Sequence, residues 1–170
     1  MQFIDLKKQQ KRIRKGIDAR IKKVLDEGRY IMGSEVYELE EKLADYVEIK
    51  NCISCSSGTD ALLIPLLAMG VGPGDAVITT PFTYIATAEV IYLLGATPVF
   101  VDIYESTFNI DPAKIEQGIN YAREKGLTPK GIIPVDLFGL PARYRLLEEL
   151  AKKNNLFVLE DAAQGFGGNI

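Results

Sequence analysis

The chain has 170 residues, of which 47% are hydrophobic and 25% are charged, as is usual for a globular domain. Its 20 lysines and arginines stand against 23 aspartates and glutamates, so no basic excess favours nucleic acid or an anionic membrane as a partner. The absence of histidine excludes Ser-His-Asp and Cys-His catalysis and a histidine-ligated metal. With no long apolar run and no signal sequence, we expect a cytoplasmic protein. Since it has no histidine, we also expect that it binds no metal.

The first part of the chain, residues 1–50, is predicted to be a helical segment. Apolar residues at helical spacing indicate a helix over residues 6–27. A loop at residues 28–33 then precedes a second helix that begins at Ser34. We interpret the lysines and arginines of the first helix as a solvated face.

Strand and helix patterns alternate through the rest of the chain. Strands are predicted around Ile53 and over residues 76–79, 97–101, 131–135 and 156–159. Helices are predicted up to Gly70, over 83–94, from Asp111, and over 143–152. This order predicts an α/β fold with a mainly parallel sheet between two helical layers, a three-layer αβα arrangement. Because no helix follows the last strand, the predicted fold of residues 51–170 is interrupted.

The turn Ser56-Ser57-Gly58-Thr59 follows the first predicted strand and opens a helix. Its small residues leave backbone N–H groups unobstructed, and the helix dipole adds partial positive charge there. The turn therefore suits a phosphate group. The alternative is an ordinary helix N-cap.

Two other strand ends carry residues that suit a planar ligand. Asp161 ends a predicted strand and would direct a carboxylate to the crevice where ligands of open α/β sheets bind, and Gln164 follows with an amide. Tyr84 follows the second predicted strand and could stack on a ring. The alternatives are a helix N-cap at Asp161 and a core role for the aromatic residue.

Two further patterns have simpler interpretations. Cys52 and Cys55 form a CxxC, but they have no second cysteine pair and are predicted within a strand, so we expect two unpaired thiols. The glycines of residues 70–75 follow a helix and precede a strand, which is the wrong context for dinucleotide binding and indicates a helix stop and turn.

A phosphate seat, an aromatic ring and an acid at neighbouring strand ends fit pyridoxal phosphate, whose protonated ring nitrogen pairs with a carboxylate. In order and spacing, the chain resembles the N-terminal part of the DegT/DnrJ/EryC1/StrS sugar aminotransferases of fold type I. The resemblance rests on Phe3-Ile4-Asp5-Leu6, Tyr30-Ile31-Met32-Gly33, Ser57-Gly58-Thr59-Asp60-Ala61-Leu62, Gly72-Pro73-Gly74-Asp75, Thr83-Tyr84-Ile85-Ala86-Thr87, Leu94-Gly95-Ala96 and Glu160-Asp161-Ala162-Ala163-Gln164.

The resemblance implies a role for each cofactor residue. The turn at residues 57–59 would bind the phosphate, Tyr84 would stack on the pyridine ring, and Asp161 would pair with the ring nitrogen. Gln164 would donate to the phenolic oxygen. Many relatives carry histidine at this position. With glutamine there, the chain resembles the branch of the family that aminates 3-keto UDP-sugar acids.

The resemblance also implies the substrates and the assembly. Tyr30, Met32 and Gly33 would lie near a UDP- or dTDP-linked keto-sugar that accepts the amino group of glutamate, in surface polysaccharide or amino-sugar biosynthesis. Family members are usually homodimers with the active site at the interface. The resemblance implies that residues 51–170 are an incomplete pyridoxal phosphate-binding large domain, truncated before its last strands. The Schiff-base lysine and the small domain are expected beyond Ile170, so the chain alone is not expected to turn over. The alternatives are a sugar dehydratase with histidine in place of that lysine, and a non-catalytic binding or regulatory module.

Overall fold

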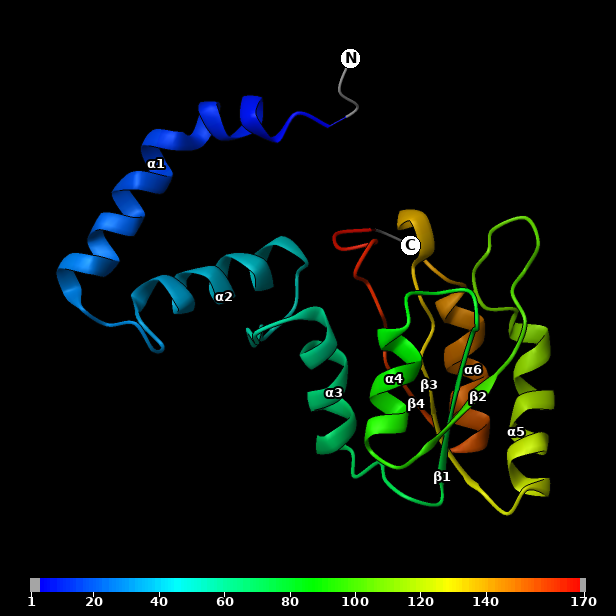
Figure 1. The fold of residues 1–170 in the computed structure, drawn as a ribbon. Coiled ribbons are helices and arrows are strands. Elements are labelled where there is room, and N and C mark those ends of the chain that lie inside the picture. Colours follow the sequence, from blue (N-terminus) through cyan, green and yellow to red (C-terminus); the bar gives the residue numbers. More distant parts are fainter. Residues whose placement is uncertain (1–3, 169–170) are drawn as a thin grey trace. The chain divides into compact units, whose positions relative to one another are not determined.

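The computed structural model describes residues 4–168, so Phe3 of the first resembling segment lies outside the described residues. The chain divides into two compact units, Met1–Ser54 and Cys55–Ile170. The N-terminal unit contains helices α1 (Leu6–Glu27) and α2 (Ser34–Tyr46), close to the predicted bounds (Figure 1). Ion pairs join the two helices, one between Arg20 and Glu38 and one between Lys23 and Glu35 at 2.9 Å. No residue of α1 is buried in this structure.

The C-terminal unit is built on a four-stranded parallel sheet in the order β2-β1-β3-β4 (Figure 1). The strands are β1 (Asp75–Thr79), β2 (Thr97–Phe100), β3 (Thr128–Ile132) and β4 (Phe157–Val158). The helices are α3 (Gly58–Ala68), α4 (Ala86–Leu93), α5 (Ile115–Glu124) and α6 (Tyr144–Asn154), with short 3₁₀ turns η1 (Pro112–Lys114) and η2 (Leu137–Gly139).

Two hydrophobic clusters attach the helices to opposite faces of the sheet. On one face, Ile119 of α5 and Leu147 of α6 belong to the same buried cluster as Ile78 of β1. On the other face, Leu66 of α3 and Ile91 of α4 belong to a cluster with Val77. Successive residues of a strand point to opposite faces, which is why neighbouring β1 residues serve different clusters. The predicted three-layer αβα fold with a parallel sheet is confirmed.

The direction of the chain across the sheet reverses between β1 and β3. From β1 the chain crosses through α4 to β2 at the edge, and from β2 it returns through α5, past β1, to β3. Ligands of open α/β sheets bind outside the carboxyl ends of the strands at such a reversal. The topology therefore points to the segments that follow β1, β3 and β4.

The strand predicted around Ile53 is wrong. Residues 51–55 form no strand, and Ile53 is 84% exposed. A strand needs a neighbour for its backbone groups, and none of the sheet's strands pairs with this segment. Instead, Ser54 donates its backbone N–H and its hydroxyl to the Glu40 carboxylate. The predicted strand context of Cys52 is thus also wrong, although both cysteines are free thiols as expected.

Several element boundaries differ from the prediction, most of all those of β3 and α4. β3 spans Thr128–Ile132 rather than residues 131–135, and it ends before Val135 because Pro134 has no N–H to donate to the ladder. Val135 keeps only an isolated parallel bridge to Asp161. Helix α4 begins at Ala86 rather than at Thr83, so the segment with Tyr84 remains a loop at the end of β1.

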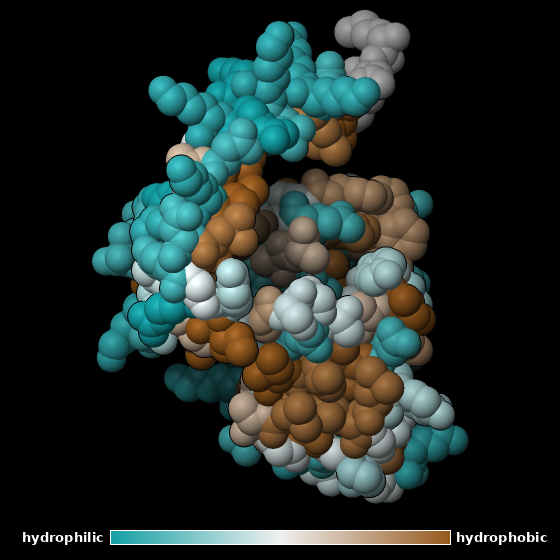
Figure 2. All heavy atoms as spheres, turned by 60° about the vertical axis from the view of Figure 1, so that its left-hand side comes forward, coloured by the Kyte–Doolittle hydropathy of each residue, from teal (hydrophilic) through white to brown (hydrophobic). Residues whose placement is uncertain are grey.

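The exposed surface of α3 and α4 includes large apolar side chains, namely Ile64, Leu67, Tyr92 and Leu93. Figure 2 shows a broad hydrophobic area on the lower part of the face that it presents. Apolar surface of this kind is typical of contacts with another protein. No helix within residues 4–168 combines the length and apolar character that a membrane crossing requires.

Candidate functional site

A cavity of about 250 Å³ lies at the carboxyl ends of the strands, in the C-terminal unit. It brings together all of the predicted cofactor residues except Ser57, which directly precedes Gly58 in the sequence. Its lining consists of Gly58, Thr59, Leu62, Thr83, Tyr84, Ala86, Val135, Asp161, Ala163 and Gln164. Segments from four parts of the chain therefore converge at the reversal point of the sheet.

The amino end of α3 forms one wall of the cavity. Ser57 caps the helix, because its Oγ accepts the Asp60 N–H at 3.1 Å and its carbonyl accepts the Ala61 N–H. The backbone N–H groups of Gly58 and Thr59 precede these and have no bond within the helix. No atom lies within 4 Å of the position that a Cβ on Gly58 would take, so a ligand can approach the backbone closely on that side of Gly58.

The hydroxyl groups of Ser56 and Ser57, beside this helix end, are already engaged. The Asp60 carboxylate accepts hydrogen bonds from the Ser56 hydroxyl and, at 3.1 Å, from the Ser57 hydroxyl. The donors left at this wall are therefore the Gly58 and Thr59 amides and the Thr59 hydroxyl. Together with the positive end of the helix dipole, two such amides suit an anion such as a phosphate.

Asp161 supplies the buried charge of the cavity, with 7% of its surface exposed. Its backbone is fixed by two bonds across the sheet end, from its N–H to Pro134 and from the Asp136 N–H to its carbonyl. Its Oδ2 accepts the Thr87 hydroxyl at 2.8 Å, and its Oδ1 accepts the Ala163 N–H at 3.3 Å. A carboxylate in such a site favours a cationic group in the adjoining cavity.

The side chain of Gln164 is oriented by a backbone bond. Its Oε1 accepts the N–H of Phe138 at 2.7 Å, which assigns oxygen to that side of the amide and leaves the Nε2 hydrogens for another acceptor. Phe138 has φ of 57°, a left-handed conformation that is rare for an aromatic residue. Strain of this kind is characteristic of functional sites, and here it accompanies the bond to Gln164.

Tyr84 lines the cavity with a side chain that is 73% exposed. Its ring makes no aromatic stacking contact with the described residues, whereas the nearby Phe82 stacks on Phe108 with 5.5 Å between ring centroids. An exposed ring beside a cavity is available to cover a planar ligand. The alternative of a core role for Tyr84 does not agree with its exposure.

The residues predicted to meet the sugar nucleotide belong to the N-terminal unit. Tyr30 and Met32 are exposed there, and Met32 has φ of 48°. Gly33 is buried and serves as N-cap of α2, where a Cβ would lie 2.7 Å from the Arg29 carbonyl oxygen. The contact with Arg29 explains the glycine locally, and the role of all three residues in substrate binding stays a prediction.

Comparison with known proteins agrees with this geometry. The profile of the DegT/DnrJ/EryC1/StrS aminotransferase family matches residues 11–170. The chain belongs to this family. The UDP-2-acetamido-2-deoxy-3-oxo-D-glucuronate aminotransferase of Pseudomonas aeruginosa is 53% identical over 99% of the chain and 45% of its own length.

Solved structures of DegT/DnrJ/EryC1/StrS relatives also match. The crystal structure of a DegT DnrJ EryC1 StrS aminotransferase from Brucella abortus superimposes with a TM-score of 0.93 at 50% identity, over 96% of this chain and 44% of that one. The crystal structure of ntda from Bacillus subtilis with bound cofactor PMP gives 0.80 at 37% identity, over 86% and 32%. The chain thus spans less than half the length of these relatives.

Sequence reasoning missed three residues around Asp161. Thr83 and Thr87 lie in a segment that resembles the family, but the sequence predicted no role for them, although they are spaced by one helical turn. Asp136 was also missed. It is 1% exposed, and its Oδ1 accepts both the Tyr144 hydroxyl at 2.7 Å and the Ala142 N–H at 3.0 Å. Its signal was an acid that follows a buried strand, the same pattern that identified Asp161.

Glu160, which directly precedes Asp161, interacts with the Asp136 carboxyl and has an unusually high pKa. Loss of hydration and a shared hydrogen bond with the Asp136 carboxyl raise the pKa of Glu160 from 4.5 to about 7. Burial and the bond to Asp136 also raise the pKa of the Tyr144 hydroxyl, so this group stays protonated. The folded chain therefore favours the protonated form of Glu160. The stability that the protonated carboxyl contributes is present at low pH and is lost as the pH rises toward the pKa of the folded state.

We therefore expect the titration of Glu160 to lower the unfolding temperature as the pH rises from 4.5 to 7. This range runs from the ordinary pKa of glutamate, 4.5, to the raised pKa of about 7 in the folded chain. Glu160→Gln, which imitates the protonated form, should remove most of this fall. Glu148→Gln on α6, where the glutamate is exposed, should leave it unchanged. Thermal unfolding followed by circular dichroism measures the effect, and equal slopes in the native chain and in Glu160→Gln would contradict the assignment.

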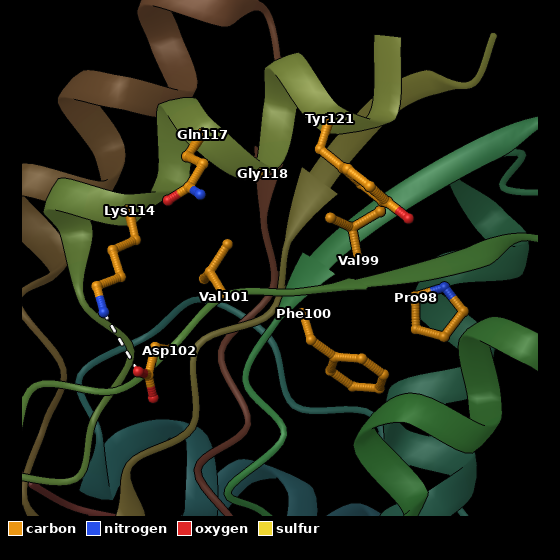
Figure 3. Close-up of a pocket in the computed structure, with 9 residues that line it drawn as sticks. All are labelled: Pro98, Val99, Phe100, Val101, Asp102, Lys114, Gln117, Gly118 and Tyr121. Carbon is orange, nitrogen blue, oxygen red and sulfur yellow. Dashed lines mark hydrogen bonds and ion pairs between the residues drawn. The ribbon is translucent and has the colours of Figure 1, made fainter. Parts of the chain in front are cut away.

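A larger hollow, about 510 Å³, lies elsewhere, between β2 and α5 (Figure 3). Val99 and Val101 point toward α5, whereas Phe100 points away from it. Its charged groups, Lys114 and Asp102, are already paired with each other at 3.2 Å. None of the predicted site residues lines it. The smaller cavity, with its buried carboxylate and open amides, is therefore the better candidate site.

Proposed function

We propose that the protein is a pyridoxal phosphate-dependent aminotransferase that moves an amino group from glutamate to a nucleotide-linked keto-sugar. The observation that carries the proposal is the meeting of a buried carboxylate, Asp161, and open helix amides in one cavity. Family membership, the aminotransferase relative and the neighbour with bound PMP, the amino form of this cofactor, support it.

The chemistry of the donor set fits the cofactor group by group. The amides of Gly58 and Thr59 are donors that match a phosphate, and the Asp161 carboxylate matches a protonated pyridine nitrogen. The free Nε2 of Gln164 matches the phenolic oxygen, and Tyr84 offers an exposed ring face. A cofactor with an anionic end, a cationic ring atom and a flat body would satisfy all of these groups.

When bound, pyridoxal phosphate supplies an electron sink for the carbanion that forms as an amino group is transferred. Asp161 would hold a proton on the ring nitrogen through its negative charge, which strengthens that sink. The α3 amides would anchor the phosphate and so fix the ring in register with Asp161. The cavity lining within residues 4–168 includes no lysine, and a Schiff-base lysine beyond Ile170 stays a prediction.

The substrates, the assembly and the cellular location are further parts of the proposal. Gln164, where many relatives carry histidine, favours a 3-keto UDP-sugar acid as acceptor, and the name of the Pseudomonas relative supports this class. Residues 30–33 would contact the sugar nucleotide. The exposed apolar side chains of α3 and α4 favour a homodimer, and the expected location is the cytoplasm.

The test is amine transfer by the protein as its gene encodes it. With glutamate and UDP-2-acetamido-2-deoxy-3-oxo-D-glucuronate, we expect 2-oxoglutarate and the 3-amino sugar in equal amounts, both dependent on pyridoxal phosphate. Mass spectrometry of the sugar and an enzymatic 2-oxoglutarate assay measure them. A deoxygenated sugar without 2-oxoglutarate would indicate the dehydratase instead. No binding of pyridoxal phosphate would overturn the proposal and favour a non-catalytic module.

A further inference from the structure

A chain of hydroxyl groups leads from α4 to the buried carboxylate of the site. The Thr87 Oγ1 lies 2.8 Å from Asp161 Oδ2 and 3.0 Å from the Thr83 Oγ1. Thr87 is completely buried, on the first turn of α4, and Thr83 lies one turn before it at the cavity wall. These two hydroxyl groups thus connect the cavity wall to the Oδ2 atom of Asp161.

The hydrogen-bond directions in this chain follow from the number of protons. An ionised carboxylate can only accept, so the single proton of the Thr87 hydroxyl must be donated to Asp161. The Thr87 oxygen is then free to accept, and the hydroxyl of Thr83 becomes its donor. Each bond polarises the next, so the second hydroxyl strengthens the bond that the first one makes to the charge.

The hydroxyl of Thr87 is not needed to fill space. Valine has nearly the same shape as threonine and would occupy the same buried volume on α4. The oxygen therefore serves an electrostatic purpose, because it gives the Oδ2 atom of Asp161 a strong, directed donor. The other oxygen, Oδ1, has only the longer 3.3 Å bond from Ala163 and retains acceptor capacity.

We propose that Thr87, supported by Thr83, is a positioning residue that orients the Asp161 carboxylate toward a protonated ring nitrogen in the cavity. The inference rests on the proposed function, since the ring nitrogen belongs to pyridoxal phosphate. Held at Oδ2 by Thr87, the carboxylate cannot rotate, and Oδ1 keeps a fixed direction. Without the hydroxyl, the carboxylate would sample several orientations and pair less well with the cation.

The test begins with two variants of Thr87 in the protein as its gene encodes it. Thr87→Val should weaken the binding of pyridoxal phosphate about tenfold, the order expected for the loss of a hydrogen bond to a charged group. It should also shift the visible absorption band of the bound cofactor, which reports protonation of the ring. Thr87→Ser restores the hydroxyl and should recover both affinity and band position.

Thr79→Val is the matched control. Thr79 is as buried as Thr87, and its hydroxyl donates to the Ile133 carbonyl at 2.8 Å rather than to Asp161. We expect it to lower the unfolding temperature without a change in affinity or absorption band. If Thr87→Val fails to fold, Thr83→Ala removes the supporting donor and should weaken binding in the same direction, by a smaller factor.

The outcomes separate this inference from the proposed function. If the native protein binds the cofactor and Thr87→Val binds it equally well with an unchanged band, the positioning role is wrong and the proposed function stands. An equal loss of affinity in Thr79→Val would also contradict the positioning role, because a general loss of packing would explain both. If the native protein binds no pyridoxal phosphate, both fail.

Discussion

Asp161→Asn is expected to lower the affinity for pyridoxal phosphate by roughly 100- to 1000-fold, the size of effect seen when a buried charge pair loses one partner. Asparagine keeps the shape of the side chain and can still accept the Thr87 hydroxyl. Only the negative charge that would face the ring nitrogen is removed. Fluorescence titration with pyridoxal phosphate measures the affinity, and amine transfer from glutamate should fall with it.

The control for this prediction lies in the other hollow of the molecule. Asp102→Asn removes an exposed charge that pairs with Lys114 between β2 and α5, and it should leave cofactor affinity unchanged. The two variants carry the same chemical change in different cavities. A loss of binding in Asp102→Asn, with normal binding in Asp161→Asn, would place the cofactor in the larger hollow and overturn the site assignment.

The sequence predicts those parts of this structure that depend on periodicity and on strand ends. Alternating apolar segments indicated the parallel sheet and its helical layers, because burial on both faces requires them. An acid directly after a buried strand indicated Asp161, since the carboxyl ends of parallel strands meet at one edge. The small residues at 57–59 indicated an open helix end for a similar reason. In each case a local pattern has one structural consequence.

Features that depend on a partner far away in the sequence were missed or wrong. Ile53 has the residue type of a strand, but a strand forms only where a neighbour pairs with it, and none does. The role of Thr87 depends on Asp161, which is 74 residues away. Pro134 shortens β3 because proline has no N–H to donate to the neighbouring strand. The hydrophobic pattern of the segment does not reveal this loss. Pairing partners, rather than propensities, decided these positions.

Gly131→Ala is expected to destabilise the C-terminal unit by about 1–3 kcal/mol or more, the cost of overpacking a filled core. A Cβ at this position on β3 would lie 2.1 to 2.4 Å from ring atoms of Phe157. Gly131 and Phe157 are register partners in the parallel ladder, so the ring covers the bare backbone of its neighbour. Urea unfolding measures the loss, and Gly72→Ala, whose Cβ meets nothing closer than 4.0 Å, is the near-neutral control.

A double-mutant cycle isolates the cause. In a Phe157→Ala background the ring is absent, so Gly131→Ala should cost little or even stabilise, because alanine is preferred to glycine in a strand. An unchanged cost would mean that the backbone, rather than the ring, requires glycine here. The same ladder leads from Gly131 and Phe157 to the bridge between Val135 and Asp161. A glycine without any functional group thus helps to set the position of the carboxylate on which the site depends.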